Sequence, residues 1–442
     1  MPALISNSIE LISGVISIPG DKSISHRALI LGSLAIGETQ ITGLLESSDV
    51  LATAAALREL GADIRRSDNG AWQVFGRGVG GLAEPKSILD MGNSGTAARL
   101  LMGVVASHAF KTTFGGDTSL SNRPMERVME PLRLMGGQFV ARNGGLLPIT
   151  VTGSGSPIPI SYELPVASAQ VKSAVLFAGL NVPGLTRIIE LEPTRDHSER
   201  MLSHFGAQIT INELSKGGKS ISILGQPELT GNSISIPGDF SSAAFAIVAT
   251  LIVPSSTLKI EGVGLNPLRT GLLDTLKEMG GDITISNEHF EGGEPVGDLS
   301  VKGSSLNGIT VSTIRAPSMI DEYPILAIAA SFAHGETHMQ GLSELRVKES
   351  DRLSAIAKGL KSVGVEVSET DDSLTIQGTG SVIGGANIET ALDHRIAMAF
   401  LVMGMASKKP IIIDDGVTID TSFPDFTGLM NGLGANIELA KI

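Results

Sequence analysis

Residues 20–28 read Gly-Asp-Lys-Ser-Ile-Ser-His-Arg-Ala (GDKSISHRA), and the rest of the chain is organised around this stretch. An alternating segment precedes it and an apolar run follows it, which predicts a strand, a tight turn and the first turn of a helix. Ser23 is the expected N-cap of this helix. Lys22, Ser23 and Arg27 would then surround free backbone N–H groups at a helix N-terminus, where anions bind, phosphate above all. A capped helix with solvated charges is the alternative interpretation.

The composition is that of a globular protein with an acidic surface. The chain has 442 residues, of which 42% are hydrophobic and 18% are charged, enough for two or three domains. Aromatic residues make up only 4%, and the formal net charge is −13. We expect no nucleic-acid partner, because such a partner needs a broad basic face or aromatic stacking surfaces. Any anion site must therefore be local, made by clustered Arg, Lys and helix ends.

Cysteine usage and apolar runs exclude further classes of protein. The chain has no Cys, which excludes disulfides, thiolate metal sites and a Cys nucleophile. The first residues, MPALISNSIELISG, lack the basic start and apolar core of a signal peptide. The longest apolar run, residues 243–253, is too short to span a membrane. We therefore expect a cytoplasmic protein with no membrane partner.

A signature of an apolar helical stretch followed by Gly, a small, a polar and an apolar residue occurs six times. Its occurrences are LRELGADI (57–64), LRLMGGQF (132–139), LSHFGAQI (202–209), LKEMGGDI (276–283), LKSVGVEV (360–367) and MNGLGANI (430–437). In each one we expect the Gly to end a helix in a left-handed conformation, with an alternating strand after it. A period of this length indicates a repeat architecture.

Each signature is preceded by a polar turn that opens an apolar helix. These turns are GDKSISHRA (20–28), GNSGTAARL (92–100), ASAQVKSAV (167–175), GDFSSAAFA (238–246), IDEYPILAI (320–328) and LDHRIAMAF (392–400). Each repeat therefore reads turn, helix, strand, helix and strand, with hairpin strands beyond.

Six such repeats cannot be six independent domains, because each is too small to bury both faces of its sheet. The economical arrangement is an α/β (α+β) fold of two lobes with three repeats each, helices inside and sheets facing solvent. We expect one lobe at 19–237 and the other at 1–18 plus 238–442, since the fourth repeat opens with Gly-Asp as the first does. Equivalent helices would point the same way, so their N-termini would converge on an electropositive cleft.

Cationic residues recur beside these helix starts. A solvated face is the usual place for a single Arg or Lys, but equivalent positions in a repeat favour an anion-binding set, since Arg forks suit carboxylates and phosphates. The set is Lys22, Arg27, Arg99, Arg123, Arg127, Lys172, Arg195, Arg346, Lys348, Arg352 and Arg395.

Two carboxylates stand apart from the other acidic residues. Asp321 opens the apolar helix IDEYPILAIAA, and Glu349 lies in ELRVKESDRL beside Lys348 and three residues before Arg352. An acid among cations is expected to have a depressed pKa and can act as a base or a proton relay. The alternatives are an N-cap role for Asp321 and helix-surface ion pairing for Glu349.

Motifs for other chemistries are missing from the sequence. GRGVGG (76–81) has the dinucleotide glycine pattern, but LAEPKS follows it and does not start a helix. There is no HExxH or paired-His spacing and no GxSxG elbow. We therefore expect no metal and no serine hydrolase.

The chain resembles one family over nearly its whole length, from about residue 14 onward. The motifs GDKSISHRA, GNSGTAARL, SNRPMERVMEPLRLMG, LPVASAQVKSAVLFAGL, EPTRDHSERML, RVKESDRL, DHRIAMAF and TSFPDF are similar to those of 5-enolpyruvylshikimate-3-phosphate (EPSP) synthases. The residues of the motifs ASAQVKSA and RDHSE are similar to those of the class II branch. These motifs are long and occur in the same order, so the match is not accidental.

The resemblance implies a two-lobed enolpyruvyl transferase fold with six βαβαββ-type repeats, three per lobe, that closes around its substrates. The implied reaction transfers the enolpyruvyl group of phosphoenolpyruvate to the 5-hydroxyl of shikimate 3-phosphate and releases phosphate, by addition and elimination through a tetrahedral intermediate. It belongs to the shikimate pathway of aromatic amino acid biosynthesis. The family needs no metal or organic cofactor, so none is expected, and we expect a monomer.

The resemblance also implies roles for individual residues. Asp321 matches the base that takes the 5-hydroxyl proton, while Lys22 and Glu349 would handle the proton delivered to the methylene carbon. Shikimate 3-phosphate would be bound by Lys22, Ser23, Arg27, Ser168, Ala169, Gln170, Arg195, Asp321 and Lys348. Phosphoenolpyruvate would be bound by Lys22, Gly95, Arg123, Gln170, Arg352 and Arg395.

The chain departs from another branch of the family at three positions, Glu344, Thr421 and Leu100. In that branch these positions hold Asn, Lys and Pro. Sensitive family members bind glyphosate in the phosphoenolpyruvate site, and tolerant class II relatives carry Ala where this chain has Gly95. The resemblance therefore implies a glyphosate target.

Two rival functions are to be compared with this one. The sister enolpyruvyl transferase that acts on UDP-N-acetylglucosamine shares the fold, but it typically carries a Cys on a mobile loop, and this chain has none. A six-repeat clamp or scaffold on DNA is an alternative of another class. Such a clamp needs Lys and Arg spread along its helices, whereas here they cluster at helix starts.

Overall fold

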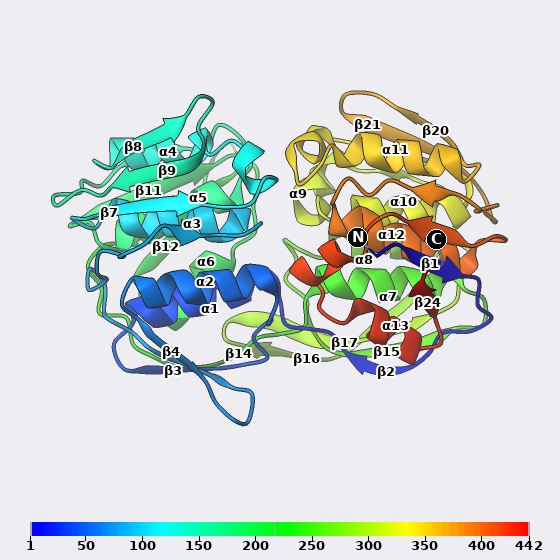
Figure 1. Cartoon of the computed structure of the whole chain (residues 1–442), viewed down its shortest axis with the longest axis horizontal. Coiled ribbons are helices and arrows are strands. Elements are labelled where there is room, and N and C mark those ends of the chain that lie inside the picture. The colour runs from blue at the N-terminus through cyan, green and yellow to red at the C-terminus, as the bar shows by residue number, and fades with distance from the viewer. Residues whose placement is uncertain (1, 216, 441–442) are drawn as a thin grey trace. The chain divides into compact units, whose positions relative to one another are not determined.

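The computed structural model describes residues 2–215 and 217–440 (Figure 1). Its contacts divide the chain into two compact units. The N-terminal lobe comprises Gly20–Ile236 with Phe290–Glu294, and the C-terminal lobe comprises the chain up to Pro19, Pro237–His289 and the chain from Pro295 onward. Phe290–Glu294 differs from the bounds expected from sequence, because it is the tip of a long hairpin whose two strands otherwise belong to the C-terminal lobe. Strand periodicity gives no sign of where such a tip packs.

The N-terminal lobe holds three four-stranded mixed sheets with the strand orders β14-β3-β5-β4, β6-β7-β9-β8 and β10-β11-β13-β12. Its helices are α1 (Lys22–Leu34), α2 (Ser48–Glu59), α3 (Gly95–Ala106), α4 (Glu126–Leu134), α5 (Ala169–Leu180) and α6 (His197–His204), with a 3-10 turn η1 at Leu120–Asn122. Its strands are β3 (Glu38–Thr42), β4 (Asp63–Arg66), β5 (Trp72–Phe75), β6 (Leu89–Asp90), β7 (Lys111–Gly115), β8 (Gln138–Arg142), β9 (Leu146–Thr152), β10 (Ser161–Glu163), β11 (Leu185–Glu190), β12 (Ile209–Glu213), β13 (Lys219–Leu224) and β14 (Ser233–Ser235).

The C-terminal lobe holds three further four-stranded sheets, with the orders β16-β17-β15-β2, β18-β19-β21-β20 and β22-β23-β1-β24. Its helices are α7 (Phe240–Ile252), α8 (Gly271–Glu278), α9 (Ala316–Met319), α10 (Tyr323–Phe332), α11 (Arg352–Ser362), α12 (His394–Ala406) and α13 (Phe426–Gly432), with 3-10 turns η2 (Thr313–Arg315), η3 (Ser343–Val347) and η4 (Val417–Thr421). Its strands are β1 (Leu4–Asn7), β2 (Ser13–Ser17), β15 (Thr257–Gly264), β16 (Asp282–Glu291), β17 (Glu294–Lys302), β18 (Thr310–Val311), β19 (His334–Gln340), β20 (Glu366–Glu369), β21 (Ser373–Thr379), β22 (Asn387–Ile388), β23 (Ile411–Ile413) and β24 (Asn436–Leu439).

One βαβαββ plan builds every sheet. In the second repeat, β6 runs parallel to β7, and β7 pairs antiparallel with β9, which pairs antiparallel with β8. The first strands of repeats one and four are exchanged, since β14 pairs parallel with β3 whereas β2 pairs parallel with β15. The fold class predicted from the six signatures is therefore confirmed.

The start of the chain completes the sixth sheet. Strand β1 pairs antiparallel with both β23 and β24, so it takes the place that β9 holds in the second repeat. Figure 1 shows both chain ends in the C-terminal lobe, with the dark blue β1 beside the red strand β24. The sixth repeat thus depends on residues from the opposite end of the sequence.

The core of each lobe is built around its apolar helices. Every residue of α7 and α10 is buried, and so is every residue of α12 except Ala406. A helix that is apolar on all sides must be surrounded by other elements. The strands supply the surrounding layer with alternating burial, as in β3 and β9, so one face of each sheet covers the helices. Within the described residues, no helix has the length and hydropathy of a bilayer span.

The structure tests two predictions about helix ends, the signature glycines and the N-cap of α1. The signature glycines Gly61, Gly136, Gly206, Gly280, Gly364 and Gly434 all have φ between 84° and 106°, which confirms their left-handed helix-end role. The prediction of Ser23 as N-cap was wrong. Asp21 is the N-cap of α1, and its Oδ1 accepts the Ile24 N–H at 2.8 Å. Both residues are good caps, and helix α1 begins two residues earlier than expected, at Lys22.

Candidate functional site

The start of α1 carries Lys22 and Ser23 in the first turn. The Nζ of Lys22 forms an ion pair with Oδ2 of Asp49 in the first turn of α2, and the two side chains are 20% and 7% exposed. The backbone carbonyl of Ser23 accepts a hydrogen bond from Nη1 of Arg27 at 2.8 Å. Lys22 thus already has a counterion, and an anionic ligand that uses Lys22 must compete with Asp49.

Arg27 is buried and held mainly by neutral groups. Its Nε donates to Oγ of Ser198 and its Nη2 to Oγ of Ser173, both at 2.8 Å. Burial, which is only partly offset by the charge of Glu199, lowers the pKa of Arg27 to about 10, and the nearby Arg195 contributes to this lowering. Arg27 therefore stays cationic at neutral pH while its guanidinium group is fixed by two hydroxyls.

The second repeat brings Gly95 and Arg123 together at the start of α3. Ser94 caps this helix, and its Oγ accepts the Ala97 N–H at 3.1 Å. A Cβ atom on Gly95 would lie 3.4 Å from Nη1 of Arg123, so the two predicted phosphoenolpyruvate residues are neighbours. Nη2 of Arg123 donates to Oδ1 of Asn93 at 2.5 Å, which orients the guanidinium group beside the helix start.

The third repeat places Ser168, Ala169 and Gln170 at the start of α5. Ser168 is the N-cap, and its Oγ accepts the Val171 N–H at 3.4 Å. The side chain of Gln170 bridges to α3, because its Oε1 accepts from Nη1 of Arg99 and its Nε2 donates to Oγ1 of Thr96, both at 3.0 Å. Gln170, Gly95 and Arg123 therefore belong to one cluster at the starts of two neighbouring helices.

Lys172 is a structural cation and does not face a ligand. Its Nζ is completely buried and lies 2.6 Å from Oε1 of Glu199, 3.0 Å from Oε2 of Glu190 and 3.3 Å from the carbonyl of Thr194. Burial alone would lower the pKa of Lys172, but the charges of Glu199 and Glu190 outweigh it and raise that pKa above its ordinary value. The ammonium group thus ties α5 to the segment between β11 and α6 that carries Arg195.

In the C-terminal lobe, Arg352 at the start of α11 is surrounded by three carboxylates. Its side chain is 1% exposed, and Nε donates to Oδ2 of Asp393 at 2.8 Å. Nη1 lies 3.3 Å from Oδ1 of Asp321, and Nη2 lies 2.5 Å from Oε2 of Glu349. Burial alone would lower the pKa of Arg352, but Asp393, Glu349 and Asp321 outweigh it and raise that pKa above its ordinary value. Arg352 is therefore a permanent cation.

Asp393 is the buried partner that orients Arg352. It is the N-cap of α12, and its Oδ1 accepts the backbone N–H of Arg395 at 3.0 Å. Burial alone would raise the pKa of Asp393, but the charge and hydrogen bonds of Arg352 outweigh it and hold that pKa below its ordinary value. The same carboxylate thus caps one helix and fixes the cation of another.

Asp321 lies in the turn between α9 and α10, among cations. Its Oδ1 is 3.4 Å from Nζ of Lys348, in addition to the Arg352 contact. Its backbone carbonyl accepts from Nη1 of Arg395 at 3.2 Å. The alternative N-cap role is not what the structure shows, because helix α10 begins at Tyr323 and Glu322 is its N-cap residue. The predicted residues Asp321, Lys348, Glu349, Arg352 and Arg395 are therefore brought together.

Glu349 does not form a helix-surface ion pair either. It precedes Asp351, the N-cap of α11, and so lies in the turn after η3. Arg346, by contrast, pairs with Asp351 and Glu369 away from this cluster. Arg346 thus has ion-pair partners outside this cluster, as does the buried Lys172 of the N-terminal lobe.

Several residues around these clusters were missed by sequence reasoning. Asp49, Ser173, Ser198, Arg269, Glu322 and Asp393 each hold a predicted residue in place. A signal existed for Asp393, since it directly precedes His394 and Arg395 in the motif DHRIAMAF. Asp49 and Arg269 lie in helix-start segments that look like ordinary surface turns, so their partners become visible only in the folded chain.

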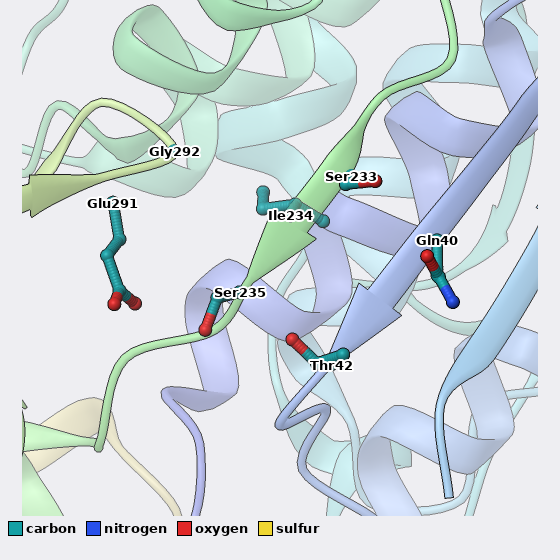
Figure 2. Close-up of a pocket in the computed structure, with 7 residues that line it drawn as sticks. All are labelled: Gln40, Thr42, Ser233, Ile234, Ser235, Glu291 and Gly292. Atoms are coloured by element: carbon teal, nitrogen blue, oxygen red, sulfur yellow. The ribbon is translucent and has the colours of Figure 1, made fainter. Parts of the chain in front are cut away.

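Two cavities are found away from these clusters. Figure 2 shows one of about 320 Å³ in the N-terminal lobe, lined by Gln40, Thr42, Ser233, Ile234, Ser235, Glu291 and Gly292. The other, of about 330 Å³ in the C-terminal lobe, is lined by Leu251, Ile252, Pro254, Ser255, Gly303, Ser304, Ser305, Leu306, Phe332, His334 and Gly380. Neither includes a predicted site residue, so we base the candidate site on the charge clusters. Over the described part of the chain, no group of three or more His, Asp or Glu side chains is arranged to hold a metal ion.

The six repeats are those of the enolpyruvyl transferase fold, and comparison with known proteins specifies the family. The family model described as EPSP synthase (3-phosphoshikimate 1-carboxyvinyltransferase) matches residues 7–430. The chain therefore belongs to the EPSP synthase family, whose members are transferases.

Individual relatives agree with this membership. The 3-phosphoshikimate 1-carboxyvinyltransferase of Paramagnetospirillum magneticum is 59% identical over 428 residues, which cover 97% of this chain and 96% of that protein. The protein of the same name from Parvibaculum lavamentivorans is 60% identical over 424 residues, which cover 96% of this chain and 94% of that protein. The structure of EPSP synthase from Acinetobacter baumannii matches with a TM-score of 0.89 and 44% identity, and the match covers both chains completely.

Proposed function

We propose that this protein transfers the enolpyruvyl group of phosphoenolpyruvate to the 5-hydroxyl of shikimate 3-phosphate and releases phosphate, in the shikimate pathway of aromatic amino acid biosynthesis. The observation that carries this proposal is membership of the EPSP synthase family over nearly the full chain. The UDP-N-acetylglucosamine transferase and the clamp considered from sequence are not favoured by this membership. Two multiply anionic substrates also suit a protein whose fixed cations gather at helix starts.

We assign shikimate 3-phosphate mainly to the N-terminal lobe. Lys22, Ser23 and Arg27 of α1, the helix start at Ser168, Ala169 and Gln170, and Arg195 before α6 are the proposed contacts, with Asp321 and Lys348 from the C-terminal lobe. Support comes from the fixed orientation of Arg27 by Ser173 and Ser198 and from the capped start of α5. A phosphate group at such a start gains from both the backbone N–H groups and the helix dipole.

We assign phosphoenolpyruvate to Lys22, Gly95, Arg123, Gln170, Arg352 and Arg395. At Arg352, binding of phosphoenolpyruvate is connected to the proton transfers of the reaction. Asp393 accepts from both Nε and Nη2, whereas Asp321 lies against Nη1 and Glu349 against Nη2. A substrate carboxylate that takes the Nη edge would replace Asp321 and Glu349 there, and the fork of Arg352 suits such a bidentate contact. Binding would thereby release both carboxylates for proton transfer.

In the proposed addition step, Asp321 accepts the proton of the 5-hydroxyl while that oxygen bonds to C2 of phosphoenolpyruvate. The electron pair of the C2–C3 double bond takes a proton at C3, delivered by Lys22 or Glu349, and a tetrahedral intermediate forms. In the elimination step, the group that delivered this proton takes a proton back from C3, the double bond returns and the C2–O bond to phosphate breaks. A base must be ionised, and the charge of Lys348, which lies 3.4 Å from Oδ1 of Asp321, favours its ionised form.

The test is a phosphate-release assay with purified protein, phosphoenolpyruvate and shikimate 3-phosphate, followed by identification of the product by mass spectrometry. We expect release only when both substrates are present. Release with UDP-N-acetylglucosamine in place of shikimate 3-phosphate, or none with either acceptor, would contradict the proposal. We further propose a monomer, to be measured by light scattering after size exclusion, and the cytoplasmic location expected from the sequence stays a prediction.

A further inference from the structure

Glu322 is a completely buried carboxylate directly after Asp321 in the chain. It is the N-cap residue of α10, but its side chain makes no capping bond to the helix backbone. Its backbone carbonyl accepts the Leu326 N–H at 2.9 Å, so the residue is locked to the first helical turn. A buried carboxylate that neither caps its helix nor reaches solvent requires another explanation.

The side chain of Glu322 joins a hydrogen-bonded group from three elements. The Ser241 hydroxyl in the first turn of α7 donates to Oε1 of Glu322. Oγ of Ser241 in turn accepts from Nη2 of Arg269 at 2.5 Å. Nη2 of Arg269 also lies 3.4 Å from Oδ1 of Asp239, the N-cap of α7. Glu322, Arg269, Ser241 and Asp239 are each less than 5% exposed, so water does not weaken these contacts.

Two arginines face Glu322 and also reach Asp321. Nη1 of Arg269 and Nη1 of Arg395 each lie 3.7 Å from Oε1 of Glu322. The same Nη1 of Arg269 is 4.0 Å from Oδ2 of Asp321, and the same Nη1 of Arg395 donates to the carbonyl of Asp321 at 3.2 Å. Glu322 is thus the shared counter-charge of the two guanidinium groups that contact the proposed base.

Stabilisation of the fold does not by itself explain why the Glu322 carboxylate is buried here. Among the described residues, Oε2 of Glu322 is buried without a hydrogen-bond partner. Such an oxygen costs stability, because its bonds to water are lost and not replaced. The position is therefore better explained by what the charge does to its neighbours than by the stability it adds.

We propose that Glu322 is a positioning residue for the reaction, a role that rests on the proposed function of Asp321 and Arg395. Its negative charge holds Arg269 and Arg395 against Asp321, so that the carboxylate and the Arg395 fork are placed before substrate binds. Glu322 touches no substrate and transfers no proton. The Ser241 hydroxyl at the start of α7 donates to Oε1 and thereby fixes the position of the Glu322 carboxylate.

The experiment compares Glu322→Gln with wild type. The amide keeps the shape and removes the charge, so Arg269 and Arg395 lose their shared counter-charge. We expect kcat/KM for phosphoenolpyruvate to fall between about 10-fold and 100-fold, the usual effect of displacing a reacting group by about 1 Å. Calorimetry should show a dissociation constant for shikimate 3-phosphate within about threefold of wild type, since most of its proposed contacts lie in the N-terminal lobe.

Two further variants keep the test decisive. Glu322→Asp returns the charge on a shorter arm and should recover at least part of the lost kcat/KM. Ser241→Ala keeps the charge and removes only the hydroxyl, so its loss in kcat/KM should exceed about threefold but stay below that of Glu322→Gln. If Glu322→Gln does not fold, Ser241→Ala provides the test.

The proposal is overturned if kcat/KM for phosphoenolpyruvate stays within about threefold of wild type in Glu322→Gln, or in Ser241→Ala should the former not fold. It is equally overturned if shikimate 3-phosphate affinity falls by the same factor as kcat/KM, because a general loss of structure has that effect. If kcat/KM of Glu322→Asp is no higher than that of Glu322→Gln, that result also counts against a role for the charge. Inactivity of the wild-type protein with both substrates would instead refute the proposed function, so the two failures are distinguishable.

Discussion

Replacing Gly95 by Ala tests the proposed phosphoenolpyruvate site with a single methyl group. Gly95 is the first residue of α3, and its φ does not lie in the left-handed region, so the backbone accepts Ala without strain. The new Cβ would lie 2.7 Å from Nη1 of Arg99 and 3.4 Å from Nη1 of Arg123. Nη1 of Arg99 must therefore retreat by about 0.7 Å to reach an ordinary contact of 3.4 Å.

This retreat has a local consequence and a limited cost. Nη1 of Arg99 donates to Oε1 of Gln170 at 3.0 Å, and a shift of this size weakens that bond unless Gln170 follows. The end of an Arg side chain moves easily, and Ala is a better helix former than Gly by about 1 kcal/mol. We therefore expect the folded variant to retain stability close to that of wild type.

Glyphosate is a slightly longer anion than phosphoenolpyruvate, so the methyl group should crowd it more. Overpacking by one methyl group costs about 1–3 kcal/mol, which corresponds to roughly 5-fold to 150-fold in binding. We expect wild type to be inhibited competitively against phosphoenolpyruvate. In Gly95→Ala the inhibition constant should rise by a factor in this range, whereas KM for phosphoenolpyruvate should rise by less than about threefold.

The assay is phosphate release at several phosphoenolpyruvate concentrations, with and without glyphosate, for wild type and variant side by side. Gly432→Ala is a matched control, because a Cβ there meets no atom within 4 Å, and it should change neither constant. The reasoning is refuted if wild type is unaffected by millimolar glyphosate. It is also refuted if KM for phosphoenolpyruvate rises as much as the inhibition constant.

Three further outcomes are expected. Asp321→Asn should bind shikimate 3-phosphate nearly normally and lose about 10²–10⁴ in kcat, the usual contribution of a general base, and a variant within a few-fold of wild type by phosphate release would remove Asp321 from that role. Activity should survive exhaustive chelation, since the sequence offers no metal-ligand set, and loss with EDTA that a divalent ion restores would contradict this. Burial, helped by the charges of Lys22 and Arg27, holds the pKa of His26 well below 6.5, so the unfolded chain takes up a proton that the folded chain excludes. Stability should therefore fall as pH drops below 6.5, by up to about 1.4 kcal/mol per pH unit for this group, and urea unfolding of His26→Gln should show a weaker pH dependence between pH 7.5 and 5.5 than wild type.

The sequence by itself determined the repeat architecture. The six Gly signatures and the six polar turns each correspond to a helix end or a helix start in the structure. Local chemistry decides these features, because a left-handed Gly ends each signature helix and an Asp or Ser side chain caps five of the six helix starts, α10 being the exception. Asp21 and Ser23 are equally good capping residues, so the local sequence does not decide which of them caps α1.

Only the tertiary structure decided which residues meet. The exchange of β2 and β14 and the insertion of β1 between β23 and β24 pair segments far apart in the chain, and strand patterns carry no partner information. The same holds for the site, where Asp393 fixes Arg352 across 41 positions of sequence and Ser241 reaches Glu322 across 81. Sequence patterns identify which residues can carry charge, whereas buried ion pairs depend on distances of a few ångströms that only the folded chain sets.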